Sequence, residues 1–290
     1  MQNLLQLLSE KSYLPITTCD AIKSHSIDRP LSTYPDPNLI KHDKHADKEY
    51  FLEDEINIHD EFPFILSVTL ENYGYLEDDV FTSDFQDGRG IKYDISKYNQ
   101  RLSTIEMRGI LTGGYAEIDF DATCRLAIEG ISKKDYDNLP LHESLAIEAY
   151  LLAQESNYKM AFFTYFSAAE AILRLKTDKI KSELYPELEY AIEHLPLLDK
   201  VRIAARHKFE TADLNTLPLW GELMGLVKSC NSTRNEIAHG LIKATLTSEN
   251  VANAAACYIV LKQALINGLS SMPKIVSIYK PKKLKKPSRN

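Results

Sequence analysis

The chain has 290 residues, of which 44% are hydrophobic and 26% are charged. These fractions are ordinary for a globular protein, and the length allows two domains. No apolar run reaches the roughly 18 residues that a membrane-spanning helix needs, so the sequence excludes a membrane-spanning protein and we expect no contact with a membrane.

The N-terminal segment and the cysteines favour a cytoplasmic location. The first eight residues are apolar but lack the basic segment and the small-residue cleavage site of a signal peptide. The four cysteines are widely spaced and form no C-x-x-C pair, which is typical of thiols in a reducing compartment rather than of disulfides or zinc ligands. They are Cys19, Cys124, Cys230 and Cys257.

The net charge of −7 is unevenly distributed along the chain. Residues 273–290 contain seven Lys or Arg residues and no acid, which leaves −14 for the rest of the chain. Residues 43–87 contain fourteen acids and two lysines. Such an acidic body does not fit a general nucleic-acid-binding protein, so any contact with RNA is expected to be local.

The first 60 residues contain few clear signals. A leucine-rich segment at residues 4–8 predicts a short helix that packs on another part of the chain. His42 and His45 are spaced to face one metal ion, but they lie in a charged segment that is more typical of a solvated surface. We therefore predict neither a metal site nor a cofactor.

Residues 1–137 are predicted to form a β-rich domain whose role, sensing or regulation, is not specified by the sequence. Apolar, β-prone or alternating segments occur at 64–70 and 91–95, and 122–128 fits one more strand. Segments 104–111 and 115–120 flank Gly113-Gly114, which predicts a hairpin. These signals indicate a small, largely antiparallel sheet. No G-x-G-x-x-G or Walker-type loop is present to hold a nucleotide phosphate.

The pattern becomes helical after Pro140, which predicts a bundle over residues 138–272. The fold class is therefore α+β, with a β-rich N-terminal domain followed by an all-α bundle. Glu170 lies among small apolar residues, which places it either in a buried pair or at an interface. The expected helices span residues 142–156, 158–176, 179–194, 198–208, 217–239 and 248–271.

Residues 273–290 are predicted to be a basic, disordered tail, because a lysine-rich segment with prolines cannot bury a core. The tail could attract RNA by screened, sequence-independent forces, and a solubilising role fits equally well. The lysines that would make this contact are Lys282, Lys283, Lys285 and Lys286.

The end of the predicted helix at 217–239 combines three groups suited to phosphodiester chemistry: Arg234, Asn235 and His239. When the 2′-hydroxyl of RNA attacks the adjacent phosphorus, the reaction needs an acid or base near neutral pH and a cation for the phosphorane oxygens. His239 can supply the first and Arg234 the second. Asn235 lies one helical turn before His239, so its amide is placed to hold the imidazole or a phosphate oxygen.

The positions of Arg234 and His239 around the helix place a geometric requirement on any shared site. Five residues at 3.6 per turn place Arg234 about 140° around the helix from His239. For both to reach one phosphate, the arginine must curl over, the last turn must loosen, or two copies of the chain must face each other. The last arrangement makes a homodimer the natural expectation.

Two simpler interpretations compete with an active site. The Arg-x4-His spacing also occurs at Arg202–His207, where neither Asn nor Gly follows; with Arg206, this segment fits a basic helix surface or a phosphate contact. A helix that ends in His239-Gly240 is also a good C-cap, because glycine adopts the left-handed conformation and a cationic histidine complements the helix dipole. Spacing alone favours the cap.

The motif Arg234-Asn235-x-x-x-His239-Gly240, before a loop and a final helix, resembles the HEPN superfamily. The signature of that superfamily is an arginine, a polar residue that is commonly asparagine, and a histidine four to six residues after the arginine. The helix at 158–176 also resembles the aromatic- and alanine-rich helix of HEPN domains in bacterial defence proteins. The resemblance covers roughly residues 140–272.

The resemblance implies a metal-independent endoribonuclease that acts as a homodimer, with Arg234, Asn235 and His239 of both copies in a shared cleft. The products would carry 2′,3′-cyclic phosphate and 5′-hydroxyl ends. The expected setting is phage defence by abortive infection or a toxin–antitoxin system, with RNA such as tRNA as substrate and an antitoxin or a phage-derived trigger as partner.

Two alternatives remain open. Some HEPN domains are not catalytic, so the chain also fits a module that binds RNA, a nucleotide or a protein partner. A helical interaction protein with a fortuitous motif is the third interpretation.

Overall fold

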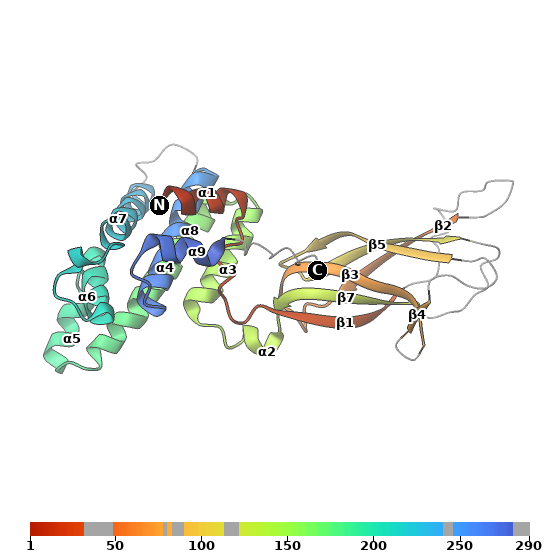
Figure 1. Ribbon diagram of the computed structural model, residues 1–290, viewed down its shortest axis with the longest axis horizontal. Coiled ribbons are helices and arrows are strands. Elements are labelled where there is room, and N and C mark those ends of the chain that lie inside the picture. The colour runs from red at the N-terminus through yellow and green to blue at the C-terminus, as the bar shows by residue number, and fades with distance from the viewer. Residues whose placement is uncertain (32–48, 78–79, 83–89, 113–121, 240–245, 281–290) are drawn as a thin grey trace, which may run out of the picture. The chain divides into compact units, whose positions relative to one another are not determined.

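The protein consists of two compact units, which we describe separately (Figure 1). One comprises Met1–Cys19 with Pro140–Asn290 and is helical; the other comprises Asp20–Leu139 and is mostly β. Within the described part of the chain, no helix is long and apolar enough to cross a membrane. The computed structural model describes residues 1–31, 49–77, 80–82, 90–112, 122–239 and 246–280.

The β unit contains two antiparallel sheets that pack face to face. One sheet has the order β1-β7-β3-β4 and the other the order β2-β6-β5. The short helix α2 (Lys133–Tyr136) follows the last strand. The strands are β1 (Lys23–Leu31), β2 (Glu49–Asn57), β3 (Phe64–Glu77), β4 (Val80–Thr82), β5 (Gly90–Asn99), β6 (Thr104–Thr112) and β7 (Ala122–Ile131).

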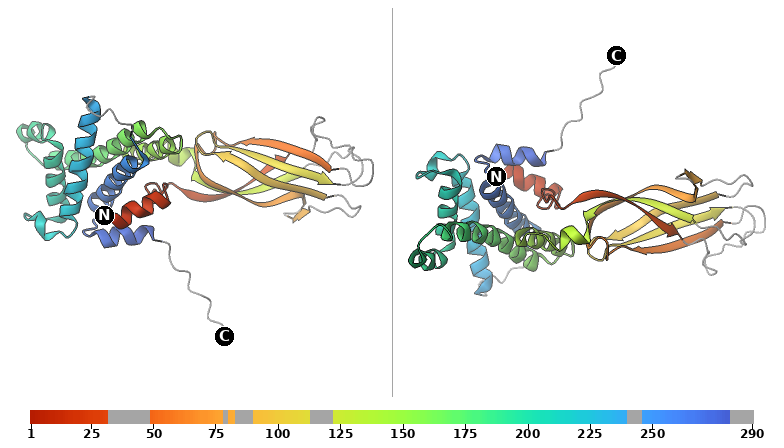
Figure 2. Two further views of the ribbon diagram at one scale, coloured as in Figure 1. Left: turned by 90° about the horizontal axis from the view of Figure 1, so that it is seen from above. Right: turned by 90° about the horizontal axis from the view of Figure 1, so that it is seen from below.

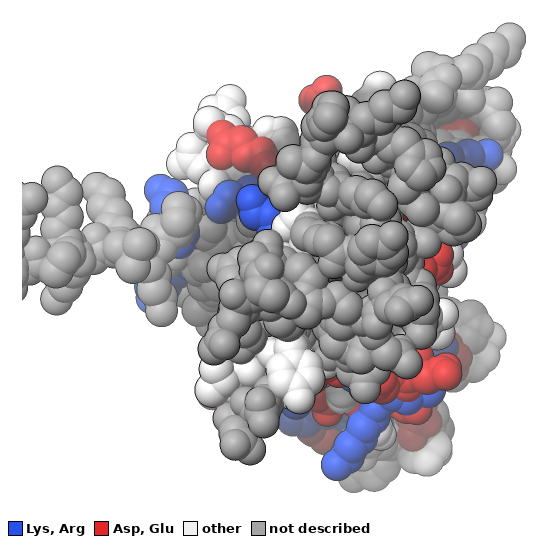
Figure 3. Space-filling model, turned by 90° about the vertical axis from the view of Figure 1, so that its right-hand side faces the viewer, with Lys and Arg blue, Asp and Glu red and all other residues white. Residues whose placement is uncertain are grey.

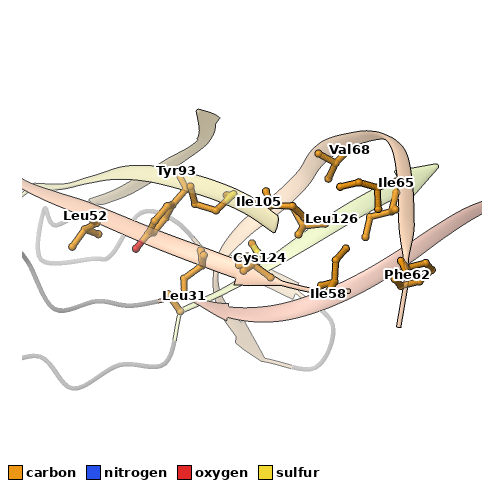
Figure 4. Packing of buried hydrophobic residues seen from close by; sticks show 14 of the residues in the cluster. Leu31, Leu52, Ile58, Phe62, Ile65, Val68, Tyr93, Ile105, Cys124 and Leu126 are labelled. Carbon is orange, nitrogen blue, oxygen red and sulfur yellow. The ribbon is translucent and has the colours of Figure 1, made fainter. Parts of the chain in front are cut away.

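The apolar residues of the β unit lie between these sheets (Figure 4). In β7, burial alternates along the strand, with Cys124 and Leu126 inside, as the two-residue period of a strand requires. Tyr93 and Ile105 enter the same core from the second sheet. Burial, and secondarily the charge of Asp54, raises the pKa of the Cys124 thiol to about 11, so this cysteine is a packing group.

The predicted hairpin around Gly113-Gly114 differs from the structure. The segment 115–120 lies outside the described residues. On the described side, β6 pairs with β2 along one edge and with β5 along the other, whereas β7, the next strand that the structure describes, belongs to the other sheet. The chain therefore passes from one sheet to the other between β6 and β7. The two glycines indicate a local turn and do not determine which sheet the following strand joins.

The outer surface of the β2-β6-β5 sheet carries paired charges of both signs. Glu53 lies opposite Arg108 in the strand register, with 3.2 Å between Oε1 and Nε. Lys97 and Glu106 form another pair, with 2.7 Å between Nζ and Oε1. Figure 3 shows basic and acidic side chains next to one another on the described surface. The ion pairs of the β2-β6-β5 sheet show that this sheet does not present a single basic surface.

The helical unit is built around α4 (Tyr158–Lys181) and α8 (Ser248–Leu261), which pack on each other (Figure 2). The apolar faces of both helices are almost wholly buried. A π-helical turn, Lys262–Ile266, extends α8. The surrounding helices are α1 (Gln2–Glu10), α3 (Leu141–Gln154), α5 (Pro186–Glu193), α6 (Leu197–Phe209), α7 (Trp220–Ala238) and α9 (Met272–Tyr279), with a 3-10 turn at Leu214–Thr216.

The first 19 residues belong to the helical unit, which corrects the predicted domain of residues 1–137 at its start. The amphipathic helix α1 buries Leu4 and Leu8 and packs on α8. The leucine-rich segment therefore packs on another part of the chain, as its pattern predicted. The β unit is consequently an insertion between α1 and α3.

The predicted tail of residues 273–290 also needs correction, because its first part is the helix α9. Ile275, Val276 and Tyr279 are buried, and the helix contacts α1. Their spacing of three to four residues is helical, but the lysines that follow masked this signal in the composition. The four lysines predicted to contact RNA, Lys282, Lys283, Lys285 and Lys286, lie outside the described residues.

A buried ion pair fastens the first 19 residues to the rest of the helical unit. Lys262, only 4% exposed, donates from Nζ to Glu143 Oε1 at 2.7 Å and to the Thr18 carbonyl at 3.1 Å. The thiol of Cys19 donates to the other Glu143 oxygen at 3.1 Å. One lysine thus joins α3, the end of α8 and the segment that follows α1.

Replacing this lysine should destabilise the helical unit strongly. Lys262→Met leaves the Glu143 carboxylate buried without its cation, which typically costs about 3–5 kcal/mol. We expect a loss of that size in the free energy of unfolding, measured by urea titration with the far-ultraviolet helix signal. Arg202→Met, which removes an exposed pair with Asp199, should change it little. Similar curves for the two variants would contradict the role of Lys262.

Candidate active site

The direction of Arg234 follows from the apolar face of α7. Leu223, Leu226, Val227 and Cys230 are buried at three- and four-residue spacing, which defines the side of the helix that faces the core. Arg234 comes four residues after Cys230, so it lies on the same side, and its side chain is half-buried. The helix therefore ends its buried face with a guanidinium.

The side-chain amide of Asn235 contacts this guanidinium. Arg234 Nη1 donates to the side-chain oxygen of Asn235 at 3.1 Å. Across the bundle, the carboxyl group of Glu170 on α4 is partly buried. Burial raises the pKa of Glu170 above its usual value, while the positive charges of Arg234 and Lys200 oppose that rise. The charges of Arg234 and Lys200 therefore act on Glu170, but no ion pair joins Glu170 to another residue of the described part of the chain.

Asn235 holds the arginine in this structure. Its side-chain oxygen accepts the bond from Arg234, and its backbone carbonyl accepts the N–H of His239 at 2.9 Å. The sequence had placed the Asn235 amide beside the imidazole or a phosphate. The observed contact instead orients the cation that a phosphate would meet.

His239 occupies the C-cap position, directly after the last helical residue, with φ −89° and ψ 4°. Its side chain is exposed, whereas that of Arg234 is half-buried. The last turn is closed by the His239 N–H bond to the carbonyl of Asn235, so the helix has not loosened. The separation of about 140° predicted from helical geometry therefore persists. Gly240, part of the predicted cap, lies outside the described residues.

The second Arg-x4-His segment lies on α6 and is occupied by acids. Arg202 pairs with Asp199 on the same helix. His207 Nε2 lies 3.2 Å from a carboxylate oxygen of Glu183. Arg206 is exposed and has no ion pair with another described residue. Because carboxylates already neutralise Arg202 and His207, these side chains are less suited to bind a phosphate than Arg234, whose partner is the neutral amide of Asn235.

Glu170 lines a hollow of about 560 Å³. Lys200 on α6 lines it too, although no pattern in the sequence selects this lysine. Only the packing of α6 against α4 brings the two side chains together. Among the described residues, no three His, Cys, Asp or Glu side chains gather as metal ligands, and His42 and His45 lie outside that part of the chain.

A comparison of the chain with protein-family models, curated proteins and solved structures found no match. The support for a function therefore comes from the residues at the end of α7 and from what surrounds them.

The environment of Glu170 predicts a specific dependence of stability on pH. Its pKa is raised above 4.5 in the folded state, so the folded protein binds this proton more tightly than the unfolded chain does. The resulting stabilisation is present below the unfolded pKa and is lost as pH rises through the folded pKa. Glu170→Gln removes this loss.

We therefore expect the free energy of unfolding of Glu170→Gln, relative to wild type, to increase between about pH 4 and pH 7. Urea titrations at both pH values measure this difference. Glu189→Gln, on the exposed surface of α5, is the matched control and should show a smaller change. A difference that stays constant or decreases with pH would show that Glu170 is not held in this environment.

Proposed function

We propose that the chain is a metal-independent endoribonuclease whose catalytic residues are Arg234, Asn235 and His239. The observation that carries this proposal is the half-buried Arg234 guanidinium, oriented by Asn235, five residues before an exposed imidazole. The resemblance to HEPN domains supports the same assignment.

The arrangement supplies what cleavage by the 2′-hydroxyl requires. The 2′-oxygen attacks phosphorus and loses its proton, the bond from phosphorus to the 5′-oxygen breaks, and the leaving oxygen takes up a proton. The products are a 2′,3′-cyclic phosphate and a 5′-hydroxyl. The imidazole of His239 is suited to a proton transfer because it titrates near neutral pH. The Arg234 fork stabilises the negative charge that develops on the phosphorane oxygens.

A second copy of the chain resolves the separation of the two groups. Arg234 points towards the core side of α7, whereas His239 is exposed at its end. In a symmetric dimer, each site could take its arginine from one protomer and its histidine from the other. We propose this composite arrangement for the active enzyme.

The proposed setting is an RNA-degrading effector in phage defence or in a toxin–antitoxin system. The β unit then serves as the sensing or regulatory part, and an antitoxin or a phage-derived molecule is the partner that controls it. The β2-β6-β5 sheet of that unit carries pairs of opposite charge, which fits recognition of a regulator better than general binding of RNA.

Loss of the imidazole should abolish cleavage. With total RNA or tRNA in EDTA, we expect His239→Ala to lower the cleavage rate by about 10²–10⁴-fold, because it removes the acid–base group, and Arg234→Ala to impair it as well. The new ends should accept phosphate from a polynucleotide kinase directly, as 5′-hydroxyl ends do. His207→Ala is the matched control on α6 and should cleave like wild type.

Equal cleavage by wild type and His239→Ala would refute the catalytic assignment. The assay includes an extract of phage-infected cells, so that an enzyme awaiting its trigger is also detected. If RNA binds but is not cut under either condition, the chain is a binding module instead. If neither Arg234→Ala nor His239→Ala changes cleavage or binding, the motif is fortuitous.

A composite site should be restored by combining two inactive variants. Arg234→Ala and His239→Ala are co-expressed with different affinity tags, and tandem purification isolates the mixed dimer. One of its two sites then contains an intact arginine and an intact histidine, so we expect about half of the wild-type rate. Each variant purified alone is the control. An inactive mixed dimer would place the complete site within one chain.

A further inference from the structure

Lys176 interrupts the buried face of α4. Ile172 lies four residues before it and Ile180 four residues after it, and both are buried. The lysine therefore lies on the same side of the helix as these isoleucines, and its side chain is half-buried. This position is unusual for a lysine, because taking an ammonium group out of water is costly unless a partner compensates the charge.

Lys208 continues the buried face of α6 in the same way. Ala204 and Ala205, four and three residues earlier, are buried, and the side chain of Lys208 is half-buried. Its Nζ donates to the carbonyl of Ile266, in the π-helical turn, at 3.0 Å. Because α4, α6 and this turn contact one another, Lys176 and Lys208 project into one junction.

A third cation, Lys179, lies one turn after Lys176 on α4 and is exposed. Burial, and then the charges of Lys208 and Lys179, lower the pKa of Lys176. None of these three lysines, which we call the lysine cluster, forms an ion pair with another described residue. The neighbouring carboxylate of Asp178 is instead paired with Lys181 at 3.0 Å. Three positive charges thus gather at the junction without a carboxylate partner.

We infer that the lysine cluster binds a phosphate group. An anion among the three ammonium groups offsets their mutual repulsion and supplies the partner that half-buried Lys176 lacks. Each ammonium group has three N–H donors, and Lys208 uses one of them for the carbonyl of Ile266. A phosphate carries several acceptor oxygens that point in different directions, so it suits cations that approach from two helices better than a planar carboxylate does.

Two sources can supply this phosphate: the backbone of an RNA strand or a small phosphorylated molecule. With RNA as the source, the inference rests on the proposed function, because the cluster then holds the substrate at a second point. With a small molecule, the site is independent of that function. Arg234, Asn235 and His239 do not belong to the cluster, so binding is measured separately from cleavage.

The first measurement uses inorganic phosphate and pyrophosphate. Both are titrated into full-length His239→Ala protein by isothermal calorimetry, at one ionic strength so that screening is constant. We expect binding, and we expect the further change Lys176→Met to weaken it at least about ten-fold, because a charge-assisted hydrogen bond is lost. Lys179→Gln should also weaken binding, and its exposed position keeps the fold intact. Lys159→Met, exposed near the start of α4, is the matched control and should bind like its parent.

The second measurement identifies the source of the phosphate. Binding of a fluorescent single-stranded RNA to the same proteins is followed by anisotropy, with and without pyrophosphate. RNA binding that pyrophosphate competes away and that Lys176→Met weakens would assign the cluster to the RNA backbone. Pyrophosphate binding that RNA does not displace would assign it to a small phosphorylated molecule.

The inference is overturned if the folded parent protein binds none of the three probes. It is also overturned if Lys176→Met and Lys179→Gln bind like the parent, or if Lys159→Met loses as much affinity as they do. In any of these cases, RNA cleavage by wild type would leave the nuclease assignment intact. Phosphate binding that depends on Lys176 and Lys179, in a protein that never cleaves RNA, would support the cluster and refute the nuclease.

Discussion

A charge at the end of an apolar helix face is the constraint on which the site of this protein depends. The buried side of α7 runs from Leu223 to Cys230 and ends with Arg234, and a guanidinium that leaves water needs polar partners. Asn235 is such a partner. Glu170 on α4 is itself partly buried, and the positive charges of Lys200 on α6 and Arg234 on α7 oppose the rise of its pKa.

This requirement separates a fixed cation from an exposed imidazole. Arg234 is held by its neighbours, whereas His239 at the helix end is exposed and not restrained by the core. A single protomer therefore presents these two groups in different directions. If the proposed nuclease site is completed by association of two copies, its activity depends on protomer concentration.

Local patterns predicted the elements of the fold better than their partners. The periods along α4 and β7 identified both elements, because burial of one face leaves a direct trace in the sequence. The hairpin partner predicted for β6 was wrong, because the sheet that a strand joins is determined by contacts with residues far away in the sequence. The helix α9 was missed because its buried Ile275 and Tyr279 precede a run of lysines. Lys200 was missed because only packing brings it to Glu170.

The chain order of the helical unit has a consequence for synthesis. Helices α1 and α9 contact each other, yet the entire β unit is made between them. The helical core therefore cannot be completed until residues 272–279 have emerged from the ribosome. The residues of the β unit are synthesised before those of the candidate site, so the β unit can fold first. An enzyme that degrades RNA would thus be unable to attack the ribosome or message from which it is being translated.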